Sequence, residues 1–176
     1  MNIFLLDTGP LVALLDRSEP DHERVESFMA RLRGARLITT GAVITEAFYF
    51  LSDVREGPAI LASFLDASGT EVRDAFSAEA LAAAVRLMSK YADVPMDFPD
   101  ATLVWIAESS GTDTILTLDR RGFSSFRFGN RRFKLLLDPL RPRDAADSRL
   151  AVSSGPSAIC AEVQEALAFS SYLFYC

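Results

Sequence analysis

Two short apolar segments of this chain each end on an aspartate. Asp7 follows the segment Ile3–Leu6, and Asp119 follows the segment Ile115–Leu118. Ligands of an open parallel α/β sheet bind outside the carboxyl ends of its strands, so both acids are expected in one pocket at that edge. Carboxylates that converge repel each other by about 4 kcal/mol per pair at about 4 Å with an effective dielectric constant of about 20. A cation usually neutralises such a cluster, and the pattern therefore predicts a metal-dependent enzyme.

A third acid, Glu46, lies within the apolar segment Ala42–Leu51, which has helical periodicity. On a helix its neighbours include Val43 and Phe50, so the carboxylate lies on or beside the apolar face. No Lys or Arg lies within one helical turn of it, and a buried carboxylate without a partner is costly. A cation from elsewhere in the fold would satisfy it. The alternative is an acid at the rim of the apolar face whose carboxylate reaches water.

Two more acids, Asp97 and Asp100, flank Phe98-Pro99 at the start of the helical segment Pro99–Ser110. Asp100 shares a helical face with Leu103, on the side that is expected to be buried. Asp97 is well placed to be the N-cap, and acids in a first turn are favoured by capping and by the helix dipole. We therefore expect a capping role for Asp97 and a functional role for Asp100.

The two strand-end acids also have simple structural interpretations. Asp7 could cap a helix that starts at Gly9-Pro10, and Asp119 could be a turn residue. Each has a hydroxyl residue nearby: Thr8 follows Asp7 directly, and Thr117 precedes Asp119 by two positions. Four acids at strand ends or on inward helix faces are nevertheless better explained together, as one cation site.

The chain is poor in the side chains that other hydrolytic chemistries need. His22 is its only histidine, and both cysteines, Cys160 and Cys176, lie in the C-terminal tail. Zinc sites draw on Cys and His, and Ser-His-Asp triads need a histidine base, so the sequence argues against both. Ligation by oxygen atoms alone suits Mg²⁺ or Mn²⁺.

The length of 176 residues suits one globular domain with a short appendage. No apolar run approaches the roughly 20 residues needed to cross a bilayer, and the N-terminal end lacks the basic segment of a signal peptide. Because a disulfide-dependent fold is also disfavoured, these features predict a cytoplasmic protein without a membrane segment.

Apolar periodicity alternates between strand and helix along residues 1–140. The expected strands are Asn2–Leu6, Arg36–Thr39, Thr70–Arg73, Thr114–Leu118 and Phe133–Leu137. The expected helices are Pro10–Leu15, Asp21–Leu32, one capped by Thr40 that runs through Leu51, Pro58–Ala67, Ser77–Tyr91 and Pro99–Ser110. In the helix Ser77–Tyr91 we expect an apolar face formed by Leu81, Val85 and Met88 or Leu87. This order predicts an α/β fold with a parallel sheet covered by helices on both faces.

The compact domain is expected to comprise residues 1–140. Residues 141–176 would form a linker and a C-terminal tail of unknown role. Within them, residues 144–156 are polar and rich in Ser and Ala, as in a linker, and residues 159–169 fit one amphipathic helix.

The net charge of −6 is unevenly distributed along the chain. Residues 120–143 contain eight Arg or Lys and a single Asp, whereas residues 1–119 are acidic. A basic segment directly after Asp119 is what a phosphodiester substrate would require. The alternative is a solvated charged surface on the last hairpin or strand.

The order and spacing of four short motifs resemble those of the PIN-domain nucleases. The motifs are Phe4–Asp16 around Asp7, Val43–Ala47 around Glu46, Asp97–Glu108 with Asp100, and Ile115–Phe123 with Asp119. Each motif is weak alone, but the ordered set is specific and covers residues 1–140. The short length without accessory domains is most similar to the VapC-type toxins of bacterial toxin–antitoxin pairs.

The resemblance implies a three-layer α/β/α sandwich with a central parallel sheet, and an endoribonuclease that depends on Mg²⁺ or Mn²⁺. Its site would consist of acids that converge at one sheet edge: Asp7, Glu46, Asp97, Asp100 and Asp119. All except Asp97 would be catalytic. Asp7 and Asp100 would bind the metal directly, Glu46 would bind it or orient water, and Asp119 would act through bound water. Asp97 would be an additional ligand.

The same resemblance implies RNA as the substrate, a cognate antitoxin protein as a partner, and a homodimer. The hydroxyls of Thr8 and Thr117 would support the acids. Five arginines would contact the RNA backbone, which positions a strand without reading its bases: Arg120, Arg121, Arg127, Arg131 and Arg132. The amino-acid sequence does not identify which RNA is cut.

Other functions compete with this interpretation. A phosphatase of the haloacid-dehalogenase type would need a second acid two residues after Asp7, where the chain has Gly9. A phospho-receiver domain would need a lysine after a late strand, and the only lysines, Lys90 and Lys134, do not lie closely after the fourth strand. A PIN-like module that binds RNA or a partner without cutting, and a housekeeping RNA-processing nuclease, stay open as alternatives.

Overall fold

The computed structural model describes residues 2–32 and 34–137 of the chain. The expected linker, the expected helix over residues 159–169 and the domain boundary at residue 140 lie outside these described residues.

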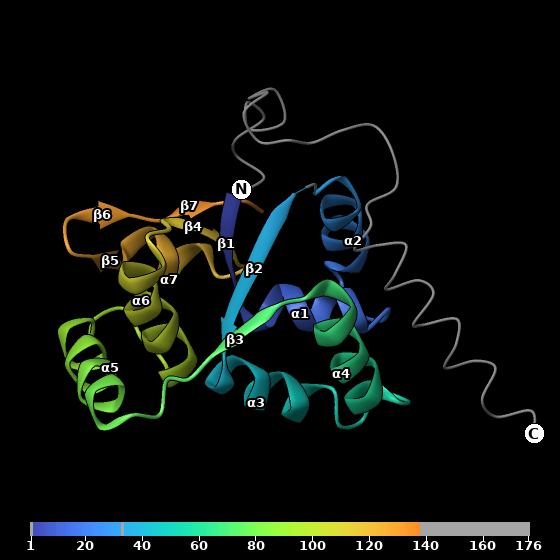
Figure 1. Ribbon diagram of the computed structural model, residues 1–176, viewed down its shortest axis with the longest axis horizontal. Helices are drawn as coiled ribbons and strands as arrows, with labels where there is room; N and C mark the ends of the chain where they lie inside the picture. The colour runs from blue at the N-terminus through green and yellow to red at the C-terminus, as the bar shows by residue number, and fades with distance from the viewer. Residues whose placement is uncertain (1, 33, 138–176) are drawn as a thin grey trace, which may run out of the picture.

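A five-stranded parallel sheet forms the centre of the molecule (Figure 1). Its spatial order is β3-β2-β1-β4-β7. The strands are β1 (Asn2–Leu6), β2 (Ala35–Thr40), β3 (Glu71–Arg73), β4 (Thr114–Leu116) and β7 (Lys134–Leu135). Every adjacent pair in this sheet is parallel, as the alternation of strands and helices predicts.

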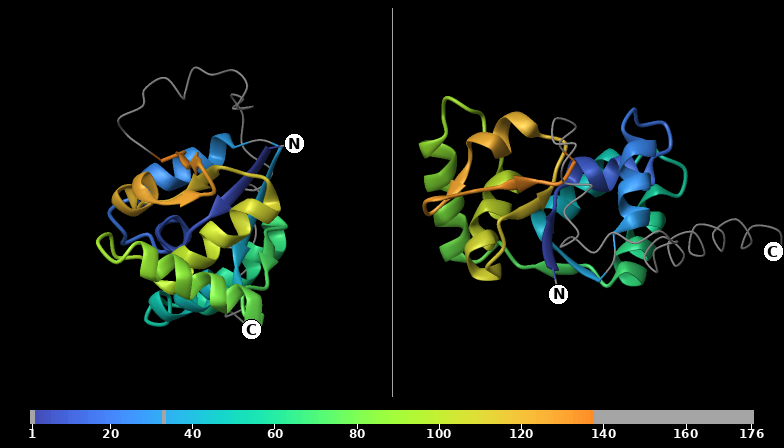
Figure 2. Two further views of the ribbon diagram at one scale, coloured as in Figure 1. Left: turned by 90° about the vertical axis from the view of Figure 1, so that its left-hand side faces the viewer. Right: turned by 90° about the horizontal axis from the view of Figure 1, so that it is seen from above.

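Helices cover both faces of this sheet, as Figures 1 and 2 show from three directions. On one side lie α1 (Thr8–Leu15), α2 (His22–Arg31) and α4 (Gly57–Ser68), and on the other lie α5 (Ala78–Lys90) and α6 (Phe98–Ser110). Helix α3 (Gly41–Phe50) follows β2 directly and lies across the carboxyl end of the sheet (Figure 1). The three-layer α/β/α fold is therefore confirmed.

Successive side chains of the central strand pack into two different cores. Phe4 and Leu6 belong to the cluster shared with α1, α2 and α4, whereas Leu5 between them belongs to the cluster shared with α5 and α6. All three are buried. Alternation with a period of two is what a strand covered on both faces requires, and it fixes the register in which β1 presents its last residue.

The order in which successive strands are added to the sheet reverses between β1 and β4, although the two strands are parallel. From β1 the chain continues to β2 and β3 on one side of the sheet, and then crosses to β4 and β7 on the other. Leu6 pairs with Leu116, and the backbone N–H of Asp7 donates to the Leu116 carbonyl at 3.1 Å. Open α/β sheets bind ligands in the crevice at such a switch point, so the fold places Asp7 and the residues after β4 at a binding position.

The exposed face of α5 corrects a sequence expectation. Three large apolar side chains point to solvent and are 42, 63 and 37% exposed: Leu81, Val85 and Met88. The buried face consists of Ala80, Ala83 and Ala84, with Leu87 partly buried beside them. The expected apolar face was wrong for Leu81, Val85 and Met88, because small side chains at the contact let α5 approach α6 closely. The size of the side chains, rather than their hydrophobicity, thus determines which face of α5 is buried.

Three short elements after Asp119 were not expected. They are α7 (Arg120–Ser125) and an antiparallel hairpin of β5 (Arg127–Phe128) and β6 (Arg131–Arg132). The expected last two strands are also shorter, because β4 ends at Leu116 and β7 spans only two residues. Elements of two to six residues are too short to show a periodicity.

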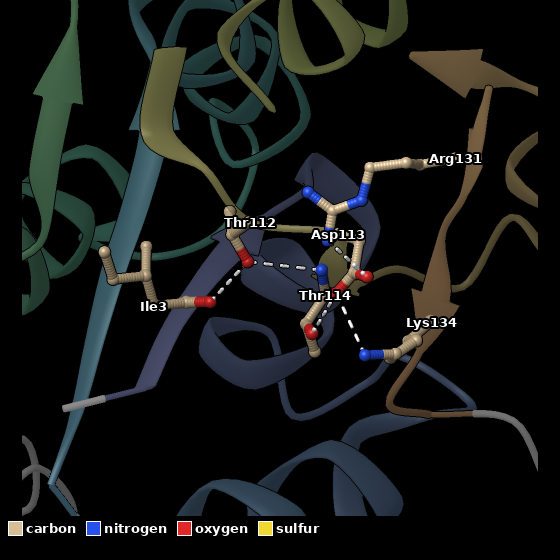
Figure 3. A network of polar contacts seen from close by, with 6 residues as sticks. All are labelled: Ile3, Thr112, Asp113, Thr114, Arg131 and Lys134. Atoms are coloured by element: carbon tan, nitrogen blue, oxygen red, sulfur yellow. Dashed lines mark hydrogen bonds and ion pairs between the residues drawn. The ribbon is translucent and has the colours of Figure 1, made fainter. Parts of the chain in front are cut away.

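One aspartate ties the hairpin to the start of β4 (Figure 3). The Asp113 carboxylate accepts a hydrogen bond from Arg131 Nη2 at 2.9 Å and lies 3.3 Å from Lys134 Nζ. Burial alone would raise the pKa of Asp113, but the hydrogen bond and charge of Lys134, with Thr114 and Arg131, hold it below its usual value. Asp113 therefore neutralises part of the basic segment at the amino end of β4.

Across the described ranges, we find no helix long and apolar enough to span a bilayer.

Candidate functional site

A cleft of about 450 Å³ opens at the carboxyl ends of β1 and β4. All five acids expected from the sequence line it: Asp7, Glu46, Asp97, Asp100 and Asp119. They come from the end of β1, from α3, from the two ends of the Asp97–Asp100 turn at α6, and from the segment after β4. The fold thus brings together residues that are more than 110 positions apart in the sequence.

Asp7 is the buried centre of the cleft, with 7% of its surface exposed. One carboxylate oxygen accepts the backbone N–H of Thr8 at 2.7 Å, and the other accepts the hydroxyl of Thr117 at 2.7 Å. The Thr117 hydroxyl in turn accepts the backbone N–H of Asp119 at 2.9 Å. The first residue of α1 and the residue after β4 therefore hold Asp7 in one orientation, and Thr117 links it to Asp119.

Three of the acids also cap helices. Asp7 is the N-cap of α1, Asp97 of α6 and Asp119 of α7. Asp97 accepts the backbone N–H of Asp100 at 2.8 Å, and Asp119 accepts that of Gly122 through both oxygens at 3.0 and 3.1 Å. The expected capping role of Asp97 is confirmed. The positive ends of three helix dipoles thus face the cleft, which lowers the cost of gathering negative charge there.

Glu46 and Asp100 are positioned by a buried contact between two helices. The hydroxyls of Thr40 and Thr102 lie 2.8 Å apart, and both threonines are buried. Thr40 caps α3, because its hydroxyl accepts the backbone N–H of Val43. This contact fixes the start of α3 against α6, and with it the separation of the two acids.

Burial, and then repulsion among the acids, raises the pKa of two carboxyls in the cleft. Burial raises the pKa of Asp7 to about 6, although hydrogen bonds from Thr117 and from the Thr8 backbone oppose the shift. The charges of Asp97 and Glu46 raise it further. A carboxyl that holds its proton this tightly lacks a compensating positive charge.

Asp100 shows the same effect more strongly. Burial, followed by the charges of Asp7, Asp97 and Asp119, raises its pKa to about 8. Among the causes resolved, only a hydrogen bond from the backbone of Asp97 to the Asp100 carboxylate works in the opposite direction. Near neutral pH, the carboxyl of Asp100 therefore stays protonated unless a cation neutralises the surrounding negative charge.

A buried hydroxyl in the cleft has no hydrogen-bond partner among the described residues. It is Thr8 Oγ1, and Thr8 is 5% exposed and lines the cleft beside Asp7. Buried polar groups without a partner are rare and need an explanation, such as an ion or ordered water. The hydroxyl is an oxygen donor next to a carboxylate, which suits a hydrated hard cation.

The donor set fits Mg²⁺ or Mn²⁺ better than a metal that needs a closed protein cage. Within residues 2–32 and 34–137, no three His, Cys, Asp or Glu side chains stand close enough to hold one ion as they are. Mg²⁺ usually keeps several waters and binds through one or two carboxylates together with substrate phosphates. Buried Asp7 and half-buried Asp100, with further acids lining the same cleft, meet that requirement.

Two features of the cleft were missed by sequence reasoning. Glu19, in the loop between α1 and α2, adds an exposed acid to its lining, and nothing in its local sequence signals this. Gly122 is the second: the Asp119 carboxylate packs directly against it, and a Cβ at this position would lie 2.0 Å from Asp119 Oδ2. The spacing of Asp119 and Gly122, an acid three residues before a glycine, matches an N-cap and its bonded N–H and could have revealed it.

The five arginines expected to contact RNA lie outside the cleft lining. Arg121 is exposed at the start of α7, directly after Asp119, and Arg120 beside it is half-buried. Arg127 donates Nη1 hydrogen bonds to the carbonyls of Ser124 and Phe126. Arg131 is bound to Asp113 at the amino end of β4, and Arg132 is exposed on the same hairpin. Of the five, Arg120 and Arg121 lie nearest in sequence to an acid of the cleft.

The raised pKa values predict how stability depends on pH in metal-free protein. Asp7 and Asp100 bind protons more tightly in the folded than in the unfolded state, so the folded state holds more protons between about pH 4 and pH 8. The free energy of unfolding should therefore fall as pH rises, by about 5 kcal/mol between about pH 5 and pH 8. Urea unfolding with chelator at several pH values measures this. A double variant Asp7→Asn, Asp100→Asn should flatten the curve, and an equally steep fall in that variant would contradict the assignment.

Comparison with known proteins places the chain in a family. The PIN domain family model matches residues 4–129. Ribonuclease VapC26 of Mycobacterium tuberculosis is 34% identical over 135 residues, which cover 75% of this chain and 98% of that protein.

A solved structure has the same fold. It is the crystal structure of Mycobacterium tuberculosis VapC20, described as a toxin that cleaves the sarcin–ricin loop. The match has a TM-score of 0.62 and 16% identity over 72% of this chain and 98% of that one. The ordered acids, the parallel sheet with its switch point, and the extent of the family match lead to one conclusion: this chain belongs to the PIN-domain family.

Proposed function

We propose that this protein is an endoribonuclease that depends on Mg²⁺ or Mn²⁺, and the toxin of a toxin–antitoxin pair. The observation that carries the proposal is the convergence of five carboxylates in one cleft, where Asp7 and Asp100 both have raised pKa values. Family membership supplies the class of reaction, since a relative that this chain matches over 98% of its length is named a ribonuclease.

Asp7 and Asp100 are the proposed direct ligands. Glu46 would hold the ion or orient water, Asp119 would act through bound water, and Asp97 would be an additional ligand. The ion would supply activation of a water molecule for in-line attack on the phosphodiester and stabilise charge on the phosphate and the leaving oxygen.

The residues around these acids prepare them for that task. Thr117 and the Thr8 backbone N–H fix the rotamer of Asp7, so its oxygens need no reorganisation when an ion binds. Asp100 must release the proton that it holds below about pH 8. The unpartnered Thr8 hydroxyl is free to donate to a phosphate oxygen or to a bound water.

Removal of divalent ions tests the proposed reaction. Purified protein should cut a single-stranded RNA in Mg²⁺ or Mn²⁺, and excess chelator should slow cleavage by more than about a hundredfold. Added Mn²⁺ should restore it, and Asp7→Asn protein prepared identically serves as the control for contaminating nuclease. Persistent cleavage in chelator would exclude the metal mechanism, and RNA binding without cleavage would favour the non-catalytic alternative.

The exposed face of α3 supports a protein partner. Phe48, Tyr49 and Phe50 are 39, 74 and 54% exposed, and Phe50 also lines the cleft. Adjacent exposed aromatic side chains are typical of interaction surfaces. An antitoxin segment that covered them would reach the acidic site, and a second copy of the chain is the alternative occupant implied for a homodimer.

Expression in a bacterial host tests the toxin assignment. The wild-type chain should arrest growth, whereas Asp7→Asn should not, and a small neighbouring reading frame that encodes a DNA-binding protein should relieve the arrest. Healthy cells that contain soluble, active nuclease would favour the housekeeping alternative. Sedimentation of the purified chain, alone and with that protein, reports the homodimer and the complex.

A further inference from the structure

A second hollow lies between α5, α6 and β5. It has a volume of about 380 Å³ and shares no lining residue with the acidic cleft. Its apolar floor includes Val104, Trp105 and Phe128. Charged side chains rim it: Glu79, Arg86, Lys90, Glu108 and Arg127. We refer to it below as the α5–α6 groove.

The charges of the α5–α6 groove are segregated by sign. Only seven residues join α5 to α6, and packed helices with so short a connection run antiparallel. Arg86 and Lys90, near the end of α5, therefore lie toward the start of α6, whereas Glu79 and Glu108 share the opposite end.

Arg127 lies at the basic end of the groove. Its backbone N–H donates to the Tyr91 hydroxyl at 2.9 Å, and Lys90 Nζ lies 5.0 Å from the centre of the Tyr91 ring. Arg127 thus lies beside the end of α5, the helix end that also carries Arg86 and Lys90.

The floor of the groove offers an aromatic surface. Trp105 is half-buried, so part of its ring system is exposed to the hollow. Proteins that bind single-stranded nucleic acid combine a positive groove along the backbone with aromatic side chains on which bases stack. Along α6, Trp105 lies five residues from Asp100, a rise of about 8 Å, so one strand can reach both sites.

We propose that the α5–α6 groove binds a segment of the substrate RNA that flanks the bond being cut. A base stacks on Trp105, and its neighbouring phosphates contact Arg86, Lys90 and Arg127. Repulsion from Glu79 and Glu108 keeps the backbone at the basic end, which gives the strand one direction across the groove. The inference rests on RNA being the substrate, and it adds a binding site remote from the acids.

Fluorescence tests the groove without cleavage, because Trp105 is the only tryptophan of the chain. Full-length Asp7→Asn protein is titrated with an RNA of mixed sequence of about twelve nucleotides, and Trp105 emission should be quenched saturably. Adding Arg86→Glu and Lys90→Glu should weaken binding at least about tenfold and reduce its salt dependence. Arg55→Glu, an exposed cation of the loop between α3 and α4 outside both hollows, is the matched control and should bind normally.

Cleavage kinetics separate this inference from the proposed function. In otherwise wild-type protein, Arg86→Glu with Lys90→Glu should raise KM for the long RNA at unchanged kcat, and should leave cleavage of a dinucleotide or trinucleotide unaffected. Suppose that the wild-type protein cuts RNA, but RNA does not quench Trp105 emission and the two substitutions do not change KM. The groove proposal is then overturned, while the proposed nuclease function is retained. If RNA is neither cut nor bound, both fail. Quenching by an acidic peptide as strong as that by RNA would also overturn the proposal, in favour of a protein-docking site.

Discussion

Asp7→Asn should abolish RNA cleavage and leave the fold intact. The loss should exceed about a hundredfold, because even a group that only supports a metal ligand is worth about ten- to a hundredfold. Asn keeps an oxygen that can accept the Thr8 N–H, and its size matches that of Asp. Because the charge removed is one that burial disfavours, the metal-free variant should be more stable than wild type at about pH 8, by about 3 kcal/mol.

The combination of lost activity and gained stability identifies a functional residue. Asp66→Asn, an exposed acid on α4 outside the cleft, serves as the control and should change neither quantity. Cleavage rates and urea unfolding in chelator measure the two effects. Cleavage by Asp7→Asn at the wild-type rate would remove Asp7 from the site, and a large loss of stability would make its role structural.

Gly122→Ala should impair both stability and cleavage, although Gly122 has no side chain to react. A Cβ at this position would lie 2.0 Å from Asp119 Oδ2 and 2.9 Å from the ring of Phe126, which is fully buried. Overpacking of this kind costs about 1–3 kcal/mol. Asp119 must also leave the Gly122 N–H that now fixes both of its oxygens, so cleavage should fall about tenfold or more.

A double-mutant cycle separates the two consequences of Gly122→Ala. If Gly122 acts by placing Asp119, the substitution should have little further effect on kcat in an Asp119→Ala background, while the part of its cost in stability that comes from the contact with Phe126 persists. Ser124→Ala, an exposed change on the same helix, is the matched control. Equal losses of activity in both backgrounds would show that Gly122 acts through general destabilisation.

The positions of the acids could be predicted because strand ends and inward helix faces are local properties of the sequence. Asp7 and Asp119 follow apolar strands, and parallel strands align their carboxyl ends, so their meeting follows from the fold class alone. Asp97 and Asp100 combine a cap signal with an inward position, and both parts of that expectation agree with the geometry.

The remaining features depend on packing that no local pattern encodes. Leu81 and Val85 form the more hydrophobic face of α5, yet the alanines are inside, because the distance to α6 selects small side chains. Glu19 enters the cleft only through the course of the loop between α1 and α2. Arg131 could not be separated from the other arginines by sequence, since its partner Asp113 lies eighteen residues away.

Calorimetric titration with Mn²⁺ tests most directly whether these carboxylates hold a divalent ion. The wild-type protein should bind Mn²⁺ saturably and release about one proton at about pH 7, because Asp100 is protonated there and must lose its proton to become a ligand. Heats measured in buffers of different ionisation enthalpy report that proton, and Asp7→Asn and Asp100→Asn should each weaken binding by about tenfold or more. Absence of saturable binding, or binding that both substitutions leave unchanged, would contradict the account.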